Sequence, residues 1–442
     1  MFDITAEDIA LLSDKDTRAL VVLLCESEMR RRGLPVSAVT GGGDQDAADG
    51  GIDARVALPD QTEIDGFIPR SATGFQVKKP NMARTEILEE MRPDGALRPS
   101  IRELADQGGA YIIVSTGTSL TDIKYKNRIN AMKEAVDDIP NKDNLTLDFI
   151  DRDRLATWVR DHAGLTLWVK RKIGQAVLGW QPYGAWSYDP NGTENEYLTD
   201  KQVRIENTKT KETGMDAISG ITAIRNTLRQ PKSSVRLVGL SGVGKTRLVQ
   251  ALFDSRAGEN GDSLNPTLAY YTDINSGPNP QPESLASDLV ATGTRAILVV
   301  DNCSPDLHRR LTNICRSNAS FVSVITVEYD IRDDEPEGTD VYVLKPSSGE
   351  LIEQLIRRRY PQISGVDIQT ISEFSGGNAR IAIALAETVG KNETLSGLGD
   401  TDLFLRLFHQ KNTEDDSLFL IAQACALFSS FQGEEISYCE EA

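Results

Sequence analysis

The chain has 442 residues, 39% of them hydrophobic and 26% charged, with a net charge of −18. This length accommodates two or three domains with separate cores, and the acidic balance excludes a protein that coats nucleic acid generally while leaving room for a local DNA site. Neither a secretory leader nor an apolar run of membrane-spanning length is present, so we expect no membrane partner. Five scattered cysteines without a C-x-x-C pair indicate a reducing cytoplasm and argue against a zinc site.

Residues 1–175 alternate helical and extended patterns, which predicts an α/β domain. Ser13 followed by Asp16 is typical of a capping box, and the helix that it opens runs to about Arg32. Glu28 lies at the edge of the apolar face of this helix.

A predicted strand follows a loop rich in glycine and aspartate. Strict alternation over residues 52–56 predicts that Ile52, Ala54 and Val56 face one side and that Asp53 faces the other.

The next predicted strand, residues 74–79, ends at a proline. Its apolar side chains point to the core, whereas Gln76 and Lys78 share the opposite face, about 7 Å apart at the rise of a strand. If the two strands are neighbours, Asp53, Gln76 and Lys78 converge. Hydrolysis of a phosphodiester needs such a set, because a carboxylate and a second oxygen hold Mg²⁺ while a lysine positions water or stabilises charge.

These motifs, residues 49–53 and 75–78, resemble the PD-(D/E)xK restriction-endonuclease superfamily, in particular its Mrr-like branches with G-x-D followed by Q-x-K. Gln76 departs from the commoner acid. The resemblance implies a restriction-endonuclease-like fold, catalysis by Asp53, Gln76 and Lys78, Mg²⁺ held by Asp53 and Gln76, and double-stranded DNA as substrate. Glu28 would match the helix acid that some members add. Strands at residues 110–115 and 145–150 and a closing helix over 155–168 complete the expected domain.

The pattern weakens over residues 176–215, which we interpret as a connector. The four tryptophans lie at the end of the first region or in this connector, and we expect them to pack one domain against the next.

Residues 239–246 read G-x-x-x-x-G-K-T between a predicted buried strand and a predicted helix, the context of a phosphate-binding P-loop. Backbone N–H groups at the start of the helix cradle phosphate, Lys245 reaches the β and γ oxygens, and the Thr246 hydroxyl ligates Mg²⁺. We therefore predict ATP and Mg²⁺ as cofactors, with the nucleotide held by Gly239, Gly242, Gly244, Lys245 and Thr246.

Further elements of a nucleotide site follow along the chain. An apolar run ends in Asp301, which we predict to hold Mg²⁺ with Thr246, and the Asn302 that follows is a poor base, which predicts slow hydrolysis. Thr326, at the end of another buried strand, is suited to sensing the γ-phosphate, and Arg380 could reach the nucleotide from a helical lid.

The order of these features resembles the STAND class of signal-transduction NTPases, with a P-loop core over 216–345, a helical lid over 346–400 and the start of a winged helix over 401–442. Joined to a nuclease, the layout resembles the antiviral STAND (Avs) proteins of bacteria and archaea. That resemblance implies a homo-oligomer, such as a tetramer, in which ATP-dependent assembly activates the nuclease and a C-terminal repeat array recognises a viral trigger protein. The sequence stops where the winged helix begins, so we expect it to be part of a longer protein.

Two alternatives stay open. An ATP-driven restriction subunit would hydrolyse ATP rapidly with DNA, which Asn302 disfavours. A regulatory nucleotide switch with an inactive nuclease fold would bind ATP without cutting DNA.

Overall fold

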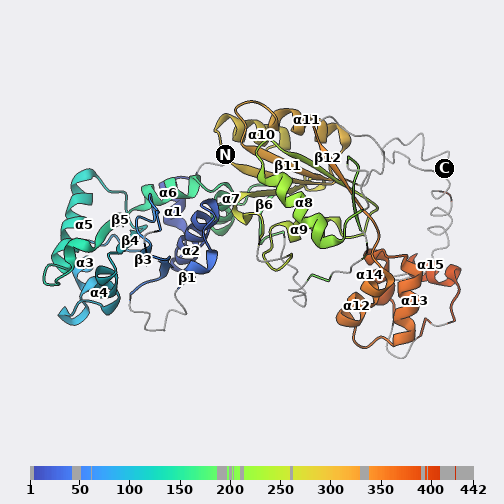
Figure 1. The fold of residues 1–442 in the computed structure, drawn as a ribbon, viewed down its shortest axis with the longest axis horizontal. Helices are drawn as coiled ribbons and strands as arrows, with labels where there is room; N and C mark the ends of the chain where they lie inside the picture. Colours follow the sequence, from blue (N-terminus) through green and yellow to red (C-terminus); the bar gives the residue numbers. More distant parts are fainter. Residues whose placement is uncertain are drawn as a thin grey trace. The chain divides into compact units, whose positions relative to one another are not determined.

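The computed structural model describes residues 4–41, 51–60, 62–186, 197–198, 202, 204–209, 214–258, 262–328, 338–389, 394–395, 397–408 and 424 (Figure 1). The chain forms two compact units. The first comprises Met1–Tyr188, Asn226–Ser234 and Ser263–Thr326, and the second comprises Asp189–Arg225, Val235–Asp262 and Val327–Ala442. The P-loop core predicted over 216–345 thus contributes to both units, and the domain boundaries stay predictions. Within the described residues, no helix combines the length and apolarity needed to cross a membrane.

The N-terminal part of the first unit is built on a five-stranded sheet of order β1-β2-β3-β4-β5. β1, β2 and β3 pair antiparallel, whereas β3, β4 and β5 pair parallel. The strands predicted near residues 74–79, 110–115 and 145–150 are confirmed. The strand bounds are β1 Val39–Gly41, β2 Ala54–Ala57, β3 Ala72–Lys78, β4 Ala110–Ser115 and β5 Thr146–Ile150.

Helices cover both faces of this sheet because its strands carry apolar side chains on both sides. One core joins the sheet to α1, α2, α6 and α7, and another joins it to α3, α4 and α5. Ser13 caps α2 as predicted, since its hydroxyl accepts from the Asp16 N–H at 3.0 Å. The helices are α1 Ala6–Leu11, α2 Asp14–Arg31, α3 Arg84–Met91, α4 Pro99–Asp106, α5 Asp122–Ala135, α6 Arg152–Arg160 and α7 Ala163–Lys172.

Two local predictions in this domain are corrected. The single helix expected over 155–168 is two helices, because His162 leaves the helical conformation and turns its ring to Glu28. Ile52 does not share the core of Ala54 and Val56, since β2 begins only at Ala54 and the preceding bend sends Ile52 into the other core.

The rest of the first unit carries strands in the order β6-β9-β10-β11, of which β9, β10 and β11 are parallel and β6 is antiparallel to β9. Ala163 and Leu167 of α7 pack in one core with Trp180 and Tyr270. The connector therefore supplies an edge strand. The bounds are β6 Trp180–Pro182, β9 Ala269–Asp273, β10 Ala296–Asp301, β11 Val322–Val327, α10 Pro282–Ala291 and α11 Pro305–Cys315.

The second unit contains β8, with β12 parallel to it and β7 antiparallel to β12. β7 also lies in the predicted connector. Four helices, α12 to α15, share a separate apolar core. The winged-helix start predicted over 401–442 falls outside the described residues except for 401–408 and Ala424.

The remaining bounds are β7 Ile205–Asn207, β8 Ser234–Val238, β12 Asp340–Leu344, α8 Ala217–Arg229, α9 Lys245–Leu252, α12 Gly349–Arg359, α13 Gly365–Ser375, α14 Ala379–Glu387 and α15 Asp400–Phe408. Short 3₁₀ helices occur at η1 Val36–Ala38, η2 Pro93–Gly95, η3 Lys142–Asn144, η4 Pro266–Leu268 and η5 Ile274–Ser276. The chain is thus a mixed α/β protein with parallel strands and many helices, consistent with a P-loop NTPase fold.

Candidate functional site

Asp53 lies where β2 begins, beside β3. The register pairs Ala54 with Phe75, and continuing it by one residue sets Asp53 opposite Gln76. The buried Asp53 carboxylate is held on both oxygens: Oδ2 accepts from the Val77 N–H at 2.7 Å, and Nε of Arg18 on α2 lies 3.1 Å from Oδ1. The register therefore sets Asp53 opposite Gln76, and the convergence of both with Lys78 in one catalytic set stays a prediction.

Gln76 is only 4% exposed, and its Oε1 has no hydrogen-bond partner in the structure. A buried carbonyl without a partner costs about 1–3 kcal/mol, so Gln76 Oε1 is an acceptor that a bound water or cation would satisfy. Amide and carboxylate oxygens are the ligands that Mg²⁺ prefers in proteins. Asp53 and Gln76 thus fit a hard divalent cation.

Lys78 is paired with a residue that the sequence did not reveal. Its Nζ lies 2.8 Å from Oε2 of Glu90 on α3, and the other Glu90 oxygen lies 2.9 Å from Nη2 of Arg98. Neither Glu90 nor Arg98 belongs to a motif, and only the fold brings them to the end of β3. Tyr111 of β4 stands in register with Gly74 of the neighbouring β3. Burial, together with the Glu90 and Asp53 carboxylates, raises the pKa of its phenol, and its hydroxyl has no hydrogen-bond partner in the structure.

Glu28 belongs to a different network from Asp53, which corrects its expected place in the catalytic set. Its carboxylate accepts from Trp158 at 3.3 Å and Arg31 at 2.7 Å and lies 3.1 Å from the His162 ring. Burial raises the pKa of Glu28, but the bonds and charges of His162 and Arg31 outweigh it and lower the pKa to about 2.

The geometry of α2 explains this separation. Glu28 lies ten residues beyond Arg18, the α2 residue that contacts Asp53, which is about 15 Å along a helix. The described contacts of Glu28 lie in the core on the α2 side of the sheet, and its catalytic role stays a prediction.

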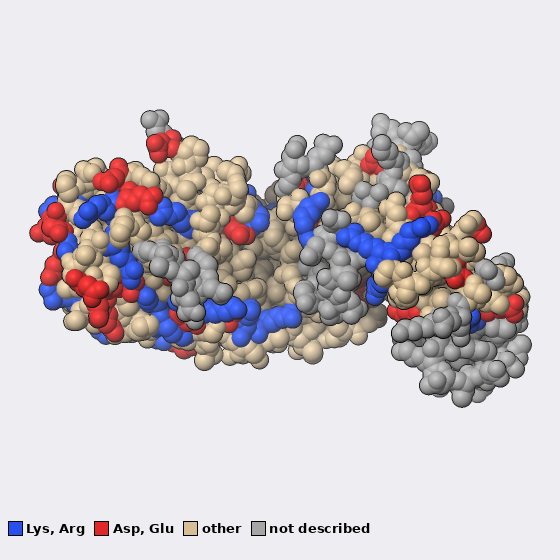
Figure 2. Space-filling model, turned by 90° about the horizontal axis from the view of Figure 1, so that it is seen from below, with Lys and Arg blue, Asp and Glu red and all other residues tan. Residues whose placement is uncertain are grey.

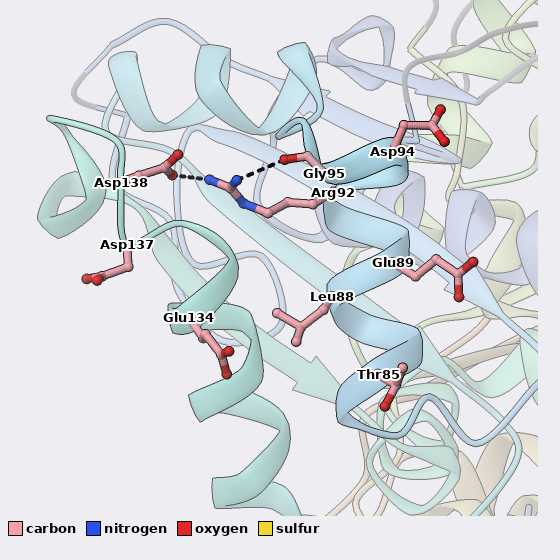
Figure 3. Close-up of a pocket in the computed structure, with 9 residues that line it drawn as sticks. All are labelled: Thr85, Leu88, Glu89, Arg92, Asp94, Gly95, Glu134, Asp137 and Asp138. Carbon is pink, nitrogen blue, oxygen red and sulfur yellow. Dashed lines mark hydrogen bonds and ion pairs between the residues drawn. The ribbon is translucent and has the colours of Figure 1, made fainter.

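An open groove between α3 and α5 is lined mainly by acidic side chains (Figure 3). Its one basic side chain, Arg92, bonds to Asp138 and to the Gly95 carbonyl. The groove contains none of the predicted catalytic residues. Its lining is Thr85, Leu88, Glu89, Arg92, Asp94, Gly95, Glu134, Asp137 and Asp138.

The P-loop of the second unit has the predicted strand–loop–helix form, from β8 into α9. Gly239, Gly242 and Gly244 have φ of 147°, 84° and 101°, values that side-chain-bearing residues rarely adopt. The ammonium of buried Lys245 donates to the carbonyls of Gly239 at 2.7 Å and Leu240 at 2.8 Å. The first N–H groups of α9 have no acceptor within the helix, which makes the loop suited to phosphate.

Helix α14 contacts this loop through its first residues. Asn378 caps α14 and donates from Nδ2 to the Ser241 carbonyl at 2.7 Å, and the Arg380 N–H donates to the Gly242 carbonyl at 3.3 Å. The helix predicted to carry Arg380 toward the nucleotide therefore contacts the loop through the Asn378 side chain and the Arg380 N–H, and the Arg380 residue is exposed.

Asp301 ends β10, as predicted, and stands in register with Asp273 of β9. Its Oδ2 accepts from the Tyr271 hydroxyl at 3.3 Å, and the Tyr271 ring stacks on Trp186 of the connector at 4.4 Å. Asn302 has a φ of 55°, and its Nδ2 donates to Asp273 Oδ1 at 2.7 Å. A carboxylate on the neighbouring strand thus orients the amide that follows Asp301.

The Thr326 hydroxyl lies 2.7 Å from Nδ1 of buried His308 on α11. The hydroxyl is therefore engaged with that helix, and its role as a γ-phosphate sensor stays a prediction.

Three of the solved structures that match parts of this chain have the following identity, coverage and TM-score. A STAND protein with a tetratricopeptide repeat sensor, PH0952 from Pyrococcus horikoshii, is 16% identical with a TM-score of 0.28, and the match covers 56% of this chain and 38% of that one. The ORC2 protein of Aeropyrum pernix, in ADPNP and ADP complexes, is 13% identical with a TM-score of 0.29 and coverage of 52% and 74%. NtrX from Brucella abortus in complex with ADP is 13% identical with a TM-score of 0.28 and coverage of 74% and 80%.

No protein-family model matches the chain, and no curated protein matches it. The chain spans 38% of the length of the STAND protein. The identification of the nucleotide site rests on the residues and hydrogen bonds of the P-loop itself.

Proposed function

We propose that the N-terminal domain is a Mg²⁺-dependent endonuclease that cuts double-stranded DNA under the control of an ATP-binding STAND module, in the manner of an antiphage defence effector. The observation that carries the nuclease proposal is the unpartnered Oε1 of buried Gln76, set opposite the Asp53 carboxylate. A buried oxygen pair of this kind suits a divalent cation better than a structural role, because a structural amide would find a donor.

Each side chain has a defined task in this proposal. Asp53 and Gln76 hold Mg²⁺, which when bound polarises the phosphodiester and activates water. Arg18 fixes the orientation of the Asp53 carboxylate through its 3.1 Å contact. Lys78 supplies positive charge to the phosphate or the attacking water.

The nucleotide module is proposed to bind ATP through the P-loop, with Thr246 and Asp301 holding Mg²⁺ and Asn302 limiting hydrolysis. We further propose that the chain assembles into a homo-oligomer such as a tetramer. Assembly would multiply weak DNA contacts through effective concentration, which an acidic protomer needs. On the face drawn in Figure 2, basic and acidic side chains are intermixed at the end that carries α3 to α5, so local cations offset the overall negative charge.

The test is the cutting of supercoiled plasmid by the full chain with Mg²⁺, with and without ATP. Asp53→Asn and Lys78→Ala should lose cutting with ATP affinity unchanged, whereas Gln76→Glu, which installs the commoner acid, should retain it. Lys142→Ala, which removes an exposed partner of Asp137 in the same domain, is the control. Cutting that persists in both Asp53→Asn and Lys78→Ala would refute the assignment.

Metal binding gives a second readout that does not depend on activation. Without nucleotide, Mn²⁺ titrated into the chain and followed by electron paramagnetic resonance should bind, and Asp53→Asn should abolish that binding. Normal ATP affinity without Mn²⁺ binding or nicking would instead favour the nucleotide switch with an inactive nuclease fold. Rapid, DNA-stimulated hydrolysis would favour the ATP-driven restriction subunit.

A further inference from the structure

Lys78 and Arg98 share one anion at the edge of the Asp53 site. The two oxygens of the Glu90 carboxylate are divided between them, at 2.8 Å to Lys78 Nζ and 2.9 Å to Arg98 Nη2. Glu90 is 14% exposed, and the two cations are about a quarter exposed. The carboxylate therefore bridges two fixed, partly desolvated cations from different elements.

Arg98 is held in place by the backbone around it. Its Nε donates to the Glu90 carbonyl at 2.6 Å. A Cβ on Gly51, which has a φ of +81°, would come within 2.5 Å of Arg98 Cδ and 2.6 Å of Nε. Position 51, two residues before Asp53, therefore requires glycine, because the Arg98 side chain packs against its backbone. The guanidinium is positioned against the segment that delivers the catalytic carboxylate.

A carboxylate and a phosphodiester present the same features to such a pair, namely two terminal oxygens that share one negative charge. We propose that Lys78 and Arg98 form the phosphodiester clamp of this site and that Glu90 is a built-in anion that occupies the clamp until DNA phosphate displaces it. This inference rests on the proposed nuclease function and adds to it a second phosphate-binding cation and an intramolecular competitor. The chain thereby lowers the affinity of its own unassembled form for DNA.

The charges around the site favour Glu90 as the occupant of the clamp over Glu90 as a second carboxylate ligand of the metal ion. Both Glu90 oxygens are engaged by cations, whereas the Gln76 Oε1 and the Tyr111 hydroxyl have no hydrogen-bond partner in the structure. When Glu90 leaves, Lys78 and Arg98 are left facing an anion-binding position beside the proposed metal ligands.

The test measures DNA binding by the full chain in the presence of EDTA, with a fluorescently labelled 20-base-pair duplex and anisotropy as the readout. Glu90→Gln keeps the shape of the side chain and removes its charge, and it should tighten binding roughly tenfold, the effect of one freed charge-assisted contact. The plot of log affinity against log salt should become steeper by about one unit, because one more phosphate is neutralised. Adding Arg98→Ala to Glu90→Gln should erase both changes.

The matched control is Glu103→Gln, which removes a carboxylate paired with Arg55 in the same domain. An equal gain in this control would show a general charge effect and overturn the proposal. A folded Glu90→Gln variant with unchanged affinity, checked by thermal unfolding and repeated with Glu90→Ala, would also overturn it. A gain in Glu90→Gln that Arg98→Ala cancels, together with cutting that survives Asp53→Asn, would support the clamp and refute only the nuclease assignment.

Discussion

The lysines of the two candidate phosphate sites, Lys245 and Lys78, differ in the partners that hold them. Lys245 donates to carbonyls of its own loop, Gly239 and Leu240, which are neutral dipoles within six residues. Lys78 is paired with the charged carboxylate of Glu90, which another helix supplies. An incoming phosphate must therefore compete with a full negative charge for Lys78, whereas two backbone carbonyls of the P-loop itself accept from Lys245. A short motif arranges the first site to bind anions. At the second site, the tertiary fold brings Glu90 to Lys78 and neutralises its charge.

The largest expected effect tests the local site. Lys245→Ala should weaken ATP binding by at least roughly a thousandfold, about 4 kcal/mol. The reason is that the Lys245 ammonium, which donates to two loop carbonyls here, would donate to phosphate oxygens when ATP is bound. Calorimetric titration with ATP measures this. Lys209→Ala, which removes an exposed partner of Asp340, is the control and should leave affinity unchanged. Equal affinities in the two variants would contradict the P-loop assignment.

The second effect tests how far the stability of the N-terminal domain depends on the contacts of Glu28 with residues distant in sequence. Glu28→Ala should lower its free energy of unfolding by roughly 3 kcal/mol, since it leaves the buried His162 and Trp158 groups without their acceptor. Denaturant unfolding, followed by near-ultraviolet circular dichroism, measures the loss. Cutting by the variant below its melting temperature should persist, and a folded variant without cutting would restore Glu28 to the catalytic set.

The same residue predicts an acid dependence. Because the pKa of Glu28 is lowered from 4.5 to about 2, its contribution to stability is complete above about pH 4.5 and is lost as the pH falls toward 2. Glu28→Gln should therefore flatten the decline of stability between pH 4.5 and 2. A decline as steep as that of the unmutated chain would contradict the network.

A third, smaller effect tests the contact of α14 with the loop. A Cβ on Gly242 would come within 2.3 Å of Asn378 Oδ1 and 2.6 Å of Arg380 Cβ at a φ of +84°. Gly242→Ala should cost about 2 kcal/mol from backbone strain and this clash together. Gly397→Ala, at a φ of +92° in open space, isolates the strain and should cost about 1 kcal/mol. Equal shifts in melting temperature would show that the α14 contact contributes nothing.

The smallest expected effect comes from Asn378→Ala, which removes the cap of α14 and the bond to Ser241. We expect about 1 kcal/mol in thermal unfolding, the usual value of a helix cap. Asn378→Ser, which can cap the helix but not reach the loop carbonyl, should recover part of it. A full recovery would mean that the contact with Ser241 adds no stability.

The sequence predicted those features whose causes are local. The P-loop followed from spacing and glycine positions, because the three positive φ values and the two carbonyls that accept from Lys245 lie within eight residues. The pairing of Asp53 with Gln76 followed from the assumption of two neighbouring strands, and the register agrees with it although the expected alternation fails at Ile52, where a bend precedes β2.

Only the tertiary structure decided which partner each charged group contacts. Glu28 carries the same carboxylate as Glu90, yet the fold places Glu28 among His162 and Trp158 and places Glu90 between Lys78 and Arg98. Spacing cannot distinguish them, because the partners of each come from helices and strands that meet only when the sheet is covered. Residue type and period determined which groups could do chemistry, and packing determined which of them face the same point.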